Sequence, residues 1–203
     1  MFEEAYATSK EITVFEKIGK PEFKKADTLT NREISAELKK AKELLNKYQV
    51  DLSTIYPVDD RTLYSFIVDE FMQKPIQDFL IPGFMSCFIY EEFHPNHEGD
   101  IKWLVRNTVE ALMNKNENGH ELSRIENFQE LNAFFNAFEI FTLHHFNIHT
   151  LQIEGDDAEC VFSIKFSGRI DVVSTKVVFS GNGKAKLKYH DPSWNISRLE
   201  LPV

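Results

Sequence analysis

Residues 158–166 read AECVFSIKF, with an apolar side chain at every second position. Successive side chains of a β-strand point to opposite faces, so side chains two positions apart share a face. Glu159, Ser163 and Lys165 stand between apolar positions and would face water. The stretch therefore predicts a half-buried strand. Its expected buried face consists of Ala158, Cys160, Phe162, Ile164 and Phe166.

The two-residue period returns in residues 174–189, which read STKVVFSGNGKAKLKY. The stretch SGNG at residues 180–183 predicts a hairpin turn, because Asn-Gly adopts positive φ at low cost. The strand after this turn would place alanine, leucine and tyrosine on one face and three lysines on the other. The lysines either bind an acidic ligand or form a solvated face that discourages strand pairing, and the second interpretation is favoured. They are Lys184, Lys186 and Lys188.

Before residue 140 the apolar period is helical instead. Thr30 and Glu33 form a capping-box pattern, in which each side chain bonds the other's free backbone amide. Asp59 and Asp60 indicate the start of a second helix. The apolar run FMSCFIYEEF predicts a buried helix, and SRIE predicts a second capping box. The expected helices are residues 31–49, a helix from Asp60 that ends by 81–83, residues 84–93, residues 101–112, and a helix opened by Ser123–Glu126.

Helices that precede strands along the chain indicate an α+β fold with an antiparallel sheet, not a βαβ winding. We expect the N-terminal helices to pack on a curved C-terminal sheet. Residues 1–55 are interpreted as an N-terminal arm plus an amphipathic helix, with residues 1–29 irregular. Residues 56–203 are interpreted as the α+β domain.

Charge and composition exclude several classes of partner. The formal net charge of −9 argues against a nucleic-acid protein, because phosphate contacts need an excess of Lys and Arg. No apolar run is long enough to span a membrane, so no membrane partner is expected. Cys87 and Cys160 form no disulfide framework, which suits a reducing compartment, and we expect a cytoplasmic protein.

Two C-terminal stretches resemble the NTF2-like, or SnoaL-like, superfamily. They are residues 148–166 (IHTLQIEGDDAECVFSIKF), a strand, an acidic turn and a strand, and residues 183–201 (GKAKLKYHDPSWNISRLEL). The resemblance implies a curved sheet wrapped around helices with an internal pocket, and a homodimer. Some members are isomerases, dehydratases or cyclases, and many others bind or scaffold. No catalytic residues of the ketosteroid-isomerase type match this sequence position by position.

Residues 91–100 read EEFHPNHEGD and have two interpretations. His94 and His97, with a nearby carboxylate, could bind zinc or ferrous iron. Pro95 disfavours a regular helix across the pair, so the spacing does not bring both rings to one face. The favoured interpretation is a connector between two helices, with Asn96 or Asp100 as the helix cap.

Residues 141–153 read FTLHHFNIHTLQI. On a regular strand, His145 and His149 would share one face with Asn147, while Phe146 and Ile148 would share the other. The two imidazoles could then act in a pocket as acid–base groups near neutral pH. The favoured alternative is that the histidines lie on a solvated face and Phe146 and Ile148 point into the core.

The function expected from the sequence is a pocket or association module without catalysis. The alternative is an isomerase- or dehydratase-type enzyme that uses His145 or His149 as general base. No nucleophile motif or phosphate-binding glycine loop is present, and no cofactor is expected. The expected ligand is an apolar or aromatic small molecule, contacted by Tyr64, Tyr90 and Phe88. Core packing is the default reading for the phenylalanines of this region, which are Phe71, Phe79, Phe84, Phe88 and Phe93.

Overall fold

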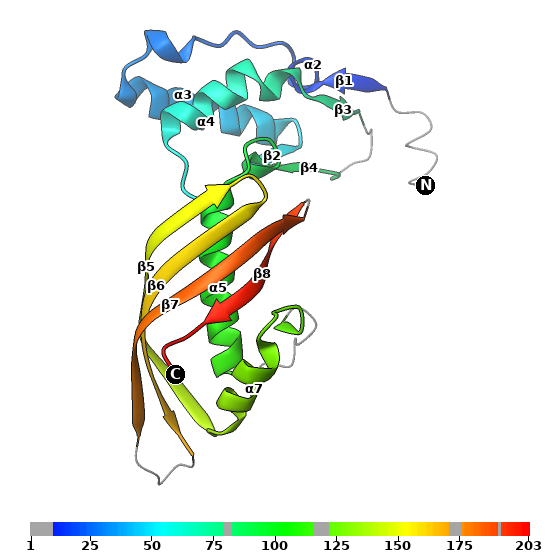
Figure 1. Ribbon diagram of the computed structural model, residues 1–203. Helices are drawn as coiled ribbons and strands as arrows, with labels where there is room; N and C mark the ends of the chain where they lie inside the picture. The colour runs from blue at the N-terminus through cyan, green and yellow to red at the C-terminus, as the bar shows by residue number, and fades with distance from the viewer. Residues whose placement is uncertain (1–9, 79–82, 116–121, 171–175, 191) are drawn as a thin grey trace. The chain divides into compact units, whose positions relative to one another are not determined.

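The computed structural model describes residues 10–78, 83–115, 122–170, 176–190 and 192–203 (Figure 1). The chain forms two compact units, one ending at Pro95 and the other beginning at Asn96. The boundary expected from the sequence lies forty residues earlier, between residues 55 and 56. The difference arises because residues 56–95 share a core with the preceding helix, as the buried side chains below show.

In the described part of the N-terminal unit there are two main helices and four short strands. The strand β1 pairs with β3 antiparallel, and β2 pairs with β4 parallel. The elements are β1 (Glu11–Thr13), α2 (Val14–Lys17), η1 (Ala26–Thr28), α3 (Asn31–Lys47), β2 (Val50–Ser53), α4 (Asp60–Asp69), η2 (Phe71–Gln73), β3 (Pro75–Gln77), β4 (Ser86–Ile89) and η3 (Tyr90–Glu92).

The two helix starts expected here are confirmed. Thr30 caps α3, and Glu33 bonds back to the Thr30 backbone at 2.9 Å. Asp59 caps α4 by accepting the Thr62 amide at 3.0 Å. Both helices bury one apolar stripe in the same cluster, which also takes in Phe71. The stripe of α3 consists of Ile34, Leu38, Ala41 and Leu45, and that of α4 includes Leu63, Tyr64, Phe66 and Ile67.

Two expectations for this unit are wrong. The run FMSCFIYEEF is not a buried helix, because Ser86–Ile89 forms the strand β4 beside β2 and Tyr90–Glu92 a single 3-10 turn. Residues 10–29 are not an irregular arm: Thr13 and Glu16 form another capping box, and Val14 and Ile18 are fully buried. Residues 1–9 and the expected turn at Ile81 and Pro82 lie outside the described residues.

Among its described residues, the C-terminal unit has a four-stranded antiparallel sheet and the helices α5 and α7. The strand order is β5-β6-β7-β8, so each strand pairs with its neighbour in sequence. The strands bend along their length, and α5 runs beside the sheet (Figure 1). The elements are α5 (His97–Met113), α7 (Phe128–Asn136), β5 (Ile140–Glu154), β6 (Asp157–Arg169), β7 (Val177–His190) and β8 (Ser193–Glu200).

The α+β class, with helices packed on a bent antiparallel sheet, is confirmed. The expected apolar face of β6 is buried. Its side chains Cys160, Phe162, Ile164 and Phe166 are each at most 1% exposed. These side chains form one cluster with Ala185 and Leu187 of β7 and with the apolar stripe of α5. That stripe consists of Ile101, Val105, Val109 and Leu112.

The prediction of a second capping box at Ser123–Glu126 is wrong. The helix α7 begins only after Asn127, and the Ser123–Glu126 segment forms turns before it. The reason is tertiary, because this segment bonds β8. The Asn127 side chain donates to the Leu199 carbonyl oxygen at 2.7 Å, and the Glu126 amide donates to the Ser197 carbonyl oxygen at 2.8 Å.

The hairpin expected at residues 180–183 is also wrong. The strand β7 runs straight through this stretch, where Asn182 lies opposite Ser163 and Gly183 opposite Phe162. The glycine is needed for space: a Cβ atom at Gly183 would lie 2.4 Å from Phe162 Cε2 and 2.9 Å from the Glu200 carbonyl oxygen. The β5–β6 turn, by contrast, falls in the acidic EGDD stretch as expected, with Gly155 at φ +60°.

Gly183→Ala is expected to destabilise the protein by about 1–3 kcal/mol, because the new methyl group overlaps a fully buried ring. Without that overlap, an alanine in a strand would stabilise the protein by about 0.5–1 kcal/mol. Urea denaturation measures the free energy of unfolding. The loss of unfolding free energy caused by Gly183→Ala is expected to be smaller in a Phe162→Leu background, because leucine lacks the ring that the new methyl group overlaps. Equal or higher stability of Gly183→Ala in the wild-type background would contradict this account.

Candidate functional site

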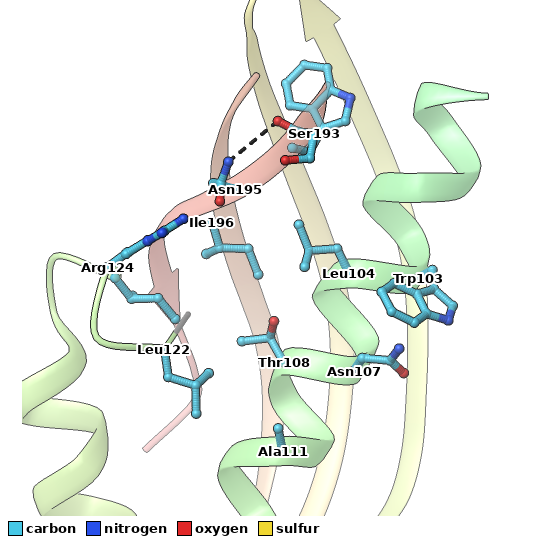
Figure 2. Close-up of a pocket in the computed structure, with 12 residues that line it drawn as sticks. Trp103, Leu104, Asn107, Thr108, Ala111, Leu122, Arg124, Ser193, Asn195 and Ile196 are labelled. Atoms are coloured by element: carbon cyan, nitrogen blue, oxygen red, sulfur yellow. Dashed lines mark hydrogen bonds between the residues drawn. The ribbon is translucent and has the colours of Figure 1, made fainter. Parts of the chain in front are cut away.

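A pocket of about 410 Å³ lies in the C-terminal unit, between α5 and β8 (Figure 2). One wall comes from α5, one from the start of β8, and the third from the segment before α7. The volume is within the range typical of small-molecule sites. The lining consists of Trp103, Leu104, Asn107, Thr108, Ala111, Leu122, Arg124, Ile125, Ser193, Trp194, Asn195 and Ile196.

Both tryptophans of the sequence line this pocket. Trp103 is 63% exposed on α5, whereas Trp194 is 7% exposed on β8. The Trp194 indole N–H donates to His97 Nδ1 at 3.1 Å, and the His97 ring packs against Tyr189 at a centroid distance of 5.2 Å. A buried indole needs such an acceptor, so His97 holds the orientation of one aromatic wall.

The polar groups of the lining are few. Arg124 extends from the segment before α7 (Figure 2). It is the only charged residue among the twelve described residues that line the pocket. Asn195 donates to the Ser193 carbonyl oxygen at 3.5 Å, a contact at the limit of a hydrogen bond. The remaining wall between them is apolar, with Leu104, Leu122 and Ile196 among its members.

Thr108 stands out among these polar groups because it is only 9% exposed. Its side chain points from α5 toward the space between Leu104 and Ile196 (Figure 2). Within the part of the chain that the structure describes, its hydroxyl makes no hydrogen bond. Because no side-chain oxygen or nitrogen of the described residues is both buried and without a partner, this hydroxyl still meets solvent and can exchange water for a polar atom of a bound molecule.

The two histidines expected in a pocket lie on β5, whose alternation is interrupted twice. The register shifts between Leu143 and His145 and again between Ile148 and Thr150, as at β-bulges. The expected grouping of faces is therefore wrong. The side chains that pack against the core are Leu143, Phe146, Ile148 and Leu151.

His145 and His149 are both exposed. His145 lies opposite Lys165, with its Nε2 3.3 Å from the Ser163 hydroxyl, and His149 Nδ1 lies 3.2 Å from the Asn147 amide nitrogen. This arrangement agrees with the favoured reading, in which Phe146 and Ile148 face the core. Neither histidine lines the α5–β8 pocket. A catalytic role for either one stays a prediction.

The three residues expected to contact a ligand all belong to the N-terminal unit. Tyr64 is fully buried and donates to the Lys24 carbonyl oxygen at 2.9 Å, and burial raises the pKa of its hydroxyl. Tyr90 packs edge-on against Phe66 at 4.9 Å, and Phe88 against Phe71 at 5.2 Å. These contacts agree with core packing, while Phe79 lies outside the described residues. Ligand binding by Tyr64, Tyr90 and Phe88 stays a prediction.

His94 and His97 belong to different units and have different partners. His94 stacks on Tyr90, and its Nε2 lies 3.0 Å from Glu70 Oε2. His97 is the first residue of α5, which Asn96 caps by accepting the Gly99 amide at 2.9 Å. The helix-cap role expected for Asn96 is confirmed. Within the described ranges, no group of three His, Cys, Asp or Glu side chains could hold a metal ion.

Sequence reasoning did not single out the groups that line the α5–β8 pocket. Trp103 and Thr108 are five positions apart on α5, and Arg124 and Trp194 come from distant segments. The available signal was the presence of only two tryptophans in a chain with 18 phenylalanines. Such a signal indicates residues worth examining but not that they lie together.

The sequence matches no model of a known protein family, and no curated protein matches it. Among solved structures, the chain is similar to Kfla4162 from Kribbella flavida, with 12% identity and a TM-score of 0.44 over 52% of this chain and 88% of that one. A dehydratase candidate of the NTF2-like family from Streptomyces avermitilis gives 10% identity and a TM-score of 0.44, over 53% and 97%. Bd1075 from Bdellovibrio bacteriovorus shows 11% identity and a TM-score of 0.40 over 76% of this chain and 61% of its own. At this level of similarity, the NTF2-like superfamily remains a resemblance.

Among the described residues, no helix combines the length and the apolar character that crossing a membrane requires.

Thr108→Val is expected to change the free energy of unfolding by no more than about 0.5 kcal/mol, because valine keeps the shape and the hydroxyl that it replaces has no hydrogen-bond partner among the described residues. Thermal or urea denaturation measures the change. Thr108→Ser, which keeps the hydroxyl and loses a methyl group, is the matched control and is expected to be less stable than wild type. A destabilised Thr108→Val would show that the hydroxyl has a structural partner.

Proposed function

We propose that this protein is an NTF2-like binding module whose α5–β8 pocket holds an apolar or aromatic small molecule without transforming it. The observation that supports the proposal most is the lining itself. It combines two tryptophans and an apolar wall with a few polar groups, in a hollow of about 410 Å³. Small-molecule sites are built in this way, with apolar area for affinity and sparse polar groups for orientation.

The topology and the cysteines support the remaining parts of this proposal. A long helix beside a bent four-stranded antiparallel sheet is the arrangement that the resemblance to NTF2-like proteins implies, and a homodimer follows from the same resemblance. Cys87 and Cys160 are both free thiols, as expected for a cytoplasmic protein. Burial raises the pKa of the Cys160 thiol to about 11, so this group is a poor nucleophile.

The isomerase or dehydratase reading has less support. It requires an imidazole beside a bound substrate, close to an acid or a tyrosine. His145 and His149 are exposed, and the hydrogen-bond contacts of their rings are with a serine and an asparagine. Each shares an open surface hollow with a glutamate, His145 with Glu110 and His149 with Glu98, but neither glutamate bonds the ring. A binding role is therefore favoured over general-base catalysis.

Binding is tested with N-phenyl-1-naphthylamine, a neutral aromatic probe that accepts excitation energy from tryptophan. Because both tryptophans line the pocket, the wild-type protein is expected to show saturable energy transfer with one probe per chain. Ala111→Phe fills the pocket from α5 and is expected to weaken probe binding by about tenfold or more.

The matched control is Ala133→Phe, the same substitution at an exposed position of α7 outside the pocket. It is expected to bind the probe as wild type does, and circular dichroism checks that both variants fold. Equal probe affinity of Ala111→Phe and Ala133→Phe, or no saturable transfer in wild type, would contradict a binding pocket at this place.

A further inference from the structure

We infer that the α5–β8 pocket selects an amphipathic organic anion, with Arg124 holding the anionic group and the Thr108 hydroxyl bonding a polar atom of the ligand body. This inference rests on the proposed function and names the ligand class of the same site. The ligand it describes is an aromatic or branched apolar molecule with one carboxylate or an equivalent acidic group.

The first argument concerns the charge of the lining. Arg124 is the single charged residue among the twelve, so the described lining contributes one positive charge and no carboxylate. The rest of the chain has the opposite balance, with a formal net charge of −9. The general field of an acidic protein repels anions, so an anionic ligand requires a cation in direct contact with it.

The second argument concerns the pairing of Arg124. In the part of the chain that the structure describes, its guanidinium makes no hydrogen bond or ion pair. Arg106 and Arg198, in the same unit, each lie 2.9 Å from a glutamate oxygen. The planar donors of an unpaired guanidinium are free to bind a carboxylate or sulfonate with two parallel hydrogen bonds.

The third argument concerns Thr108. Its hydroxyl can donate or accept and lies between the apolar side chains of Leu104 and Ile196 (Figure 2). A purely hydrocarbon ligand would displace water from this hydroxyl without replacing the lost hydrogen bond, which weakens its binding. A ligand with a second polar atom on its apolar body avoids this loss. The pocket therefore disfavours simple hydrocarbons and favours an acid with one further polar group.

The test compares two probes with the same aromatic system. N-phenyl-1-naphthylamine is neutral, and 1-anilinonaphthalene-8-sulfonate adds one anionic group. In energy-transfer titrations, Arg124→Gln is expected to weaken binding of the sulfonate by about fivefold, the effect of an exposed ion pair worth about 1 kcal/mol. The same variant is expected to leave the affinity of the neutral probe within about twofold.

Arg169→Gln removes the same charge from an exposed position outside the pocket and is the matched control. It is expected to leave both affinities unchanged. Thr108→Val is expected to lower the affinity for the sulfonate probe by about threefold, because one hydrogen bond to the probe is lost. Since valine is not expected to destabilise the fold, a weaker affinity in that variant reports on the ligand contact.

Several results would overturn the inference. Equal weakening of both probes by Arg124→Gln would mean that the charge plays no part in recognition. Equal loss of sulfonate binding in Arg124→Gln and Arg169→Gln would mean that only the net charge of the protein matters. If Thr108→Val binds the sulfonate probe as tightly as wild type does, the Thr108 hydroxyl does not contact the ligand. If neither probe receives energy from the tryptophans in wild type, the proposed binding function itself fails, and this result is distinct from a loss of selectivity.

Discussion

One row of side chains on β6 is the constraint on which the rest of the C-terminal unit depends. Cys160, Phe162, Ile164 and Phe166 are each at most 1% exposed and share a cluster with the apolar stripe of α5. Burying each large member of such a row contributes about 1.5–3 kcal/mol, more than most local preferences can offset. Neighbouring strands therefore adapt their backbone to this row.

The strand β5 shows that adaptation. Regular alternation would place Phe146 and Ile148 on the face opposite Leu143 and Leu151. Two register shifts bring all four side chains to the core and leave His145 exposed. Gly183 adapts in another way, by omitting a side chain where the Phe162 ring lies. In both places, the burial of the β6 face decides the local geometry.

The pocket lies beside this packed region, between α5 and β8. Its walls come from three separate segments, so its composition reflects the fold and not any local motif. Trp194 is held by His97, while Arg124 and Thr108 have no partner among the described residues. Polar groups without a protein partner in a mostly apolar hollow are available to bind the polar atoms of a ligand.

The sequence by itself determined the elements whose signals are local: the helix starts at Thr30 and Asp59, the helix cap at Asn96, the acidic β-turn, and the buried face of β6. These depend on side chains within a few residues of one another, which the sequence specifies directly. Tertiary structure decided the rest. The capping box expected at Ser123 does not form, because the segment that follows hydrogen-bonds β8. The Asn-Gly pair lies within a strand and not in a turn, and Gly183 packs against the Phe162 ring there. The pocket was equally out of reach, because its lining residues lie up to 93 positions apart, from Trp103 to Ile196, and only folding brings them together.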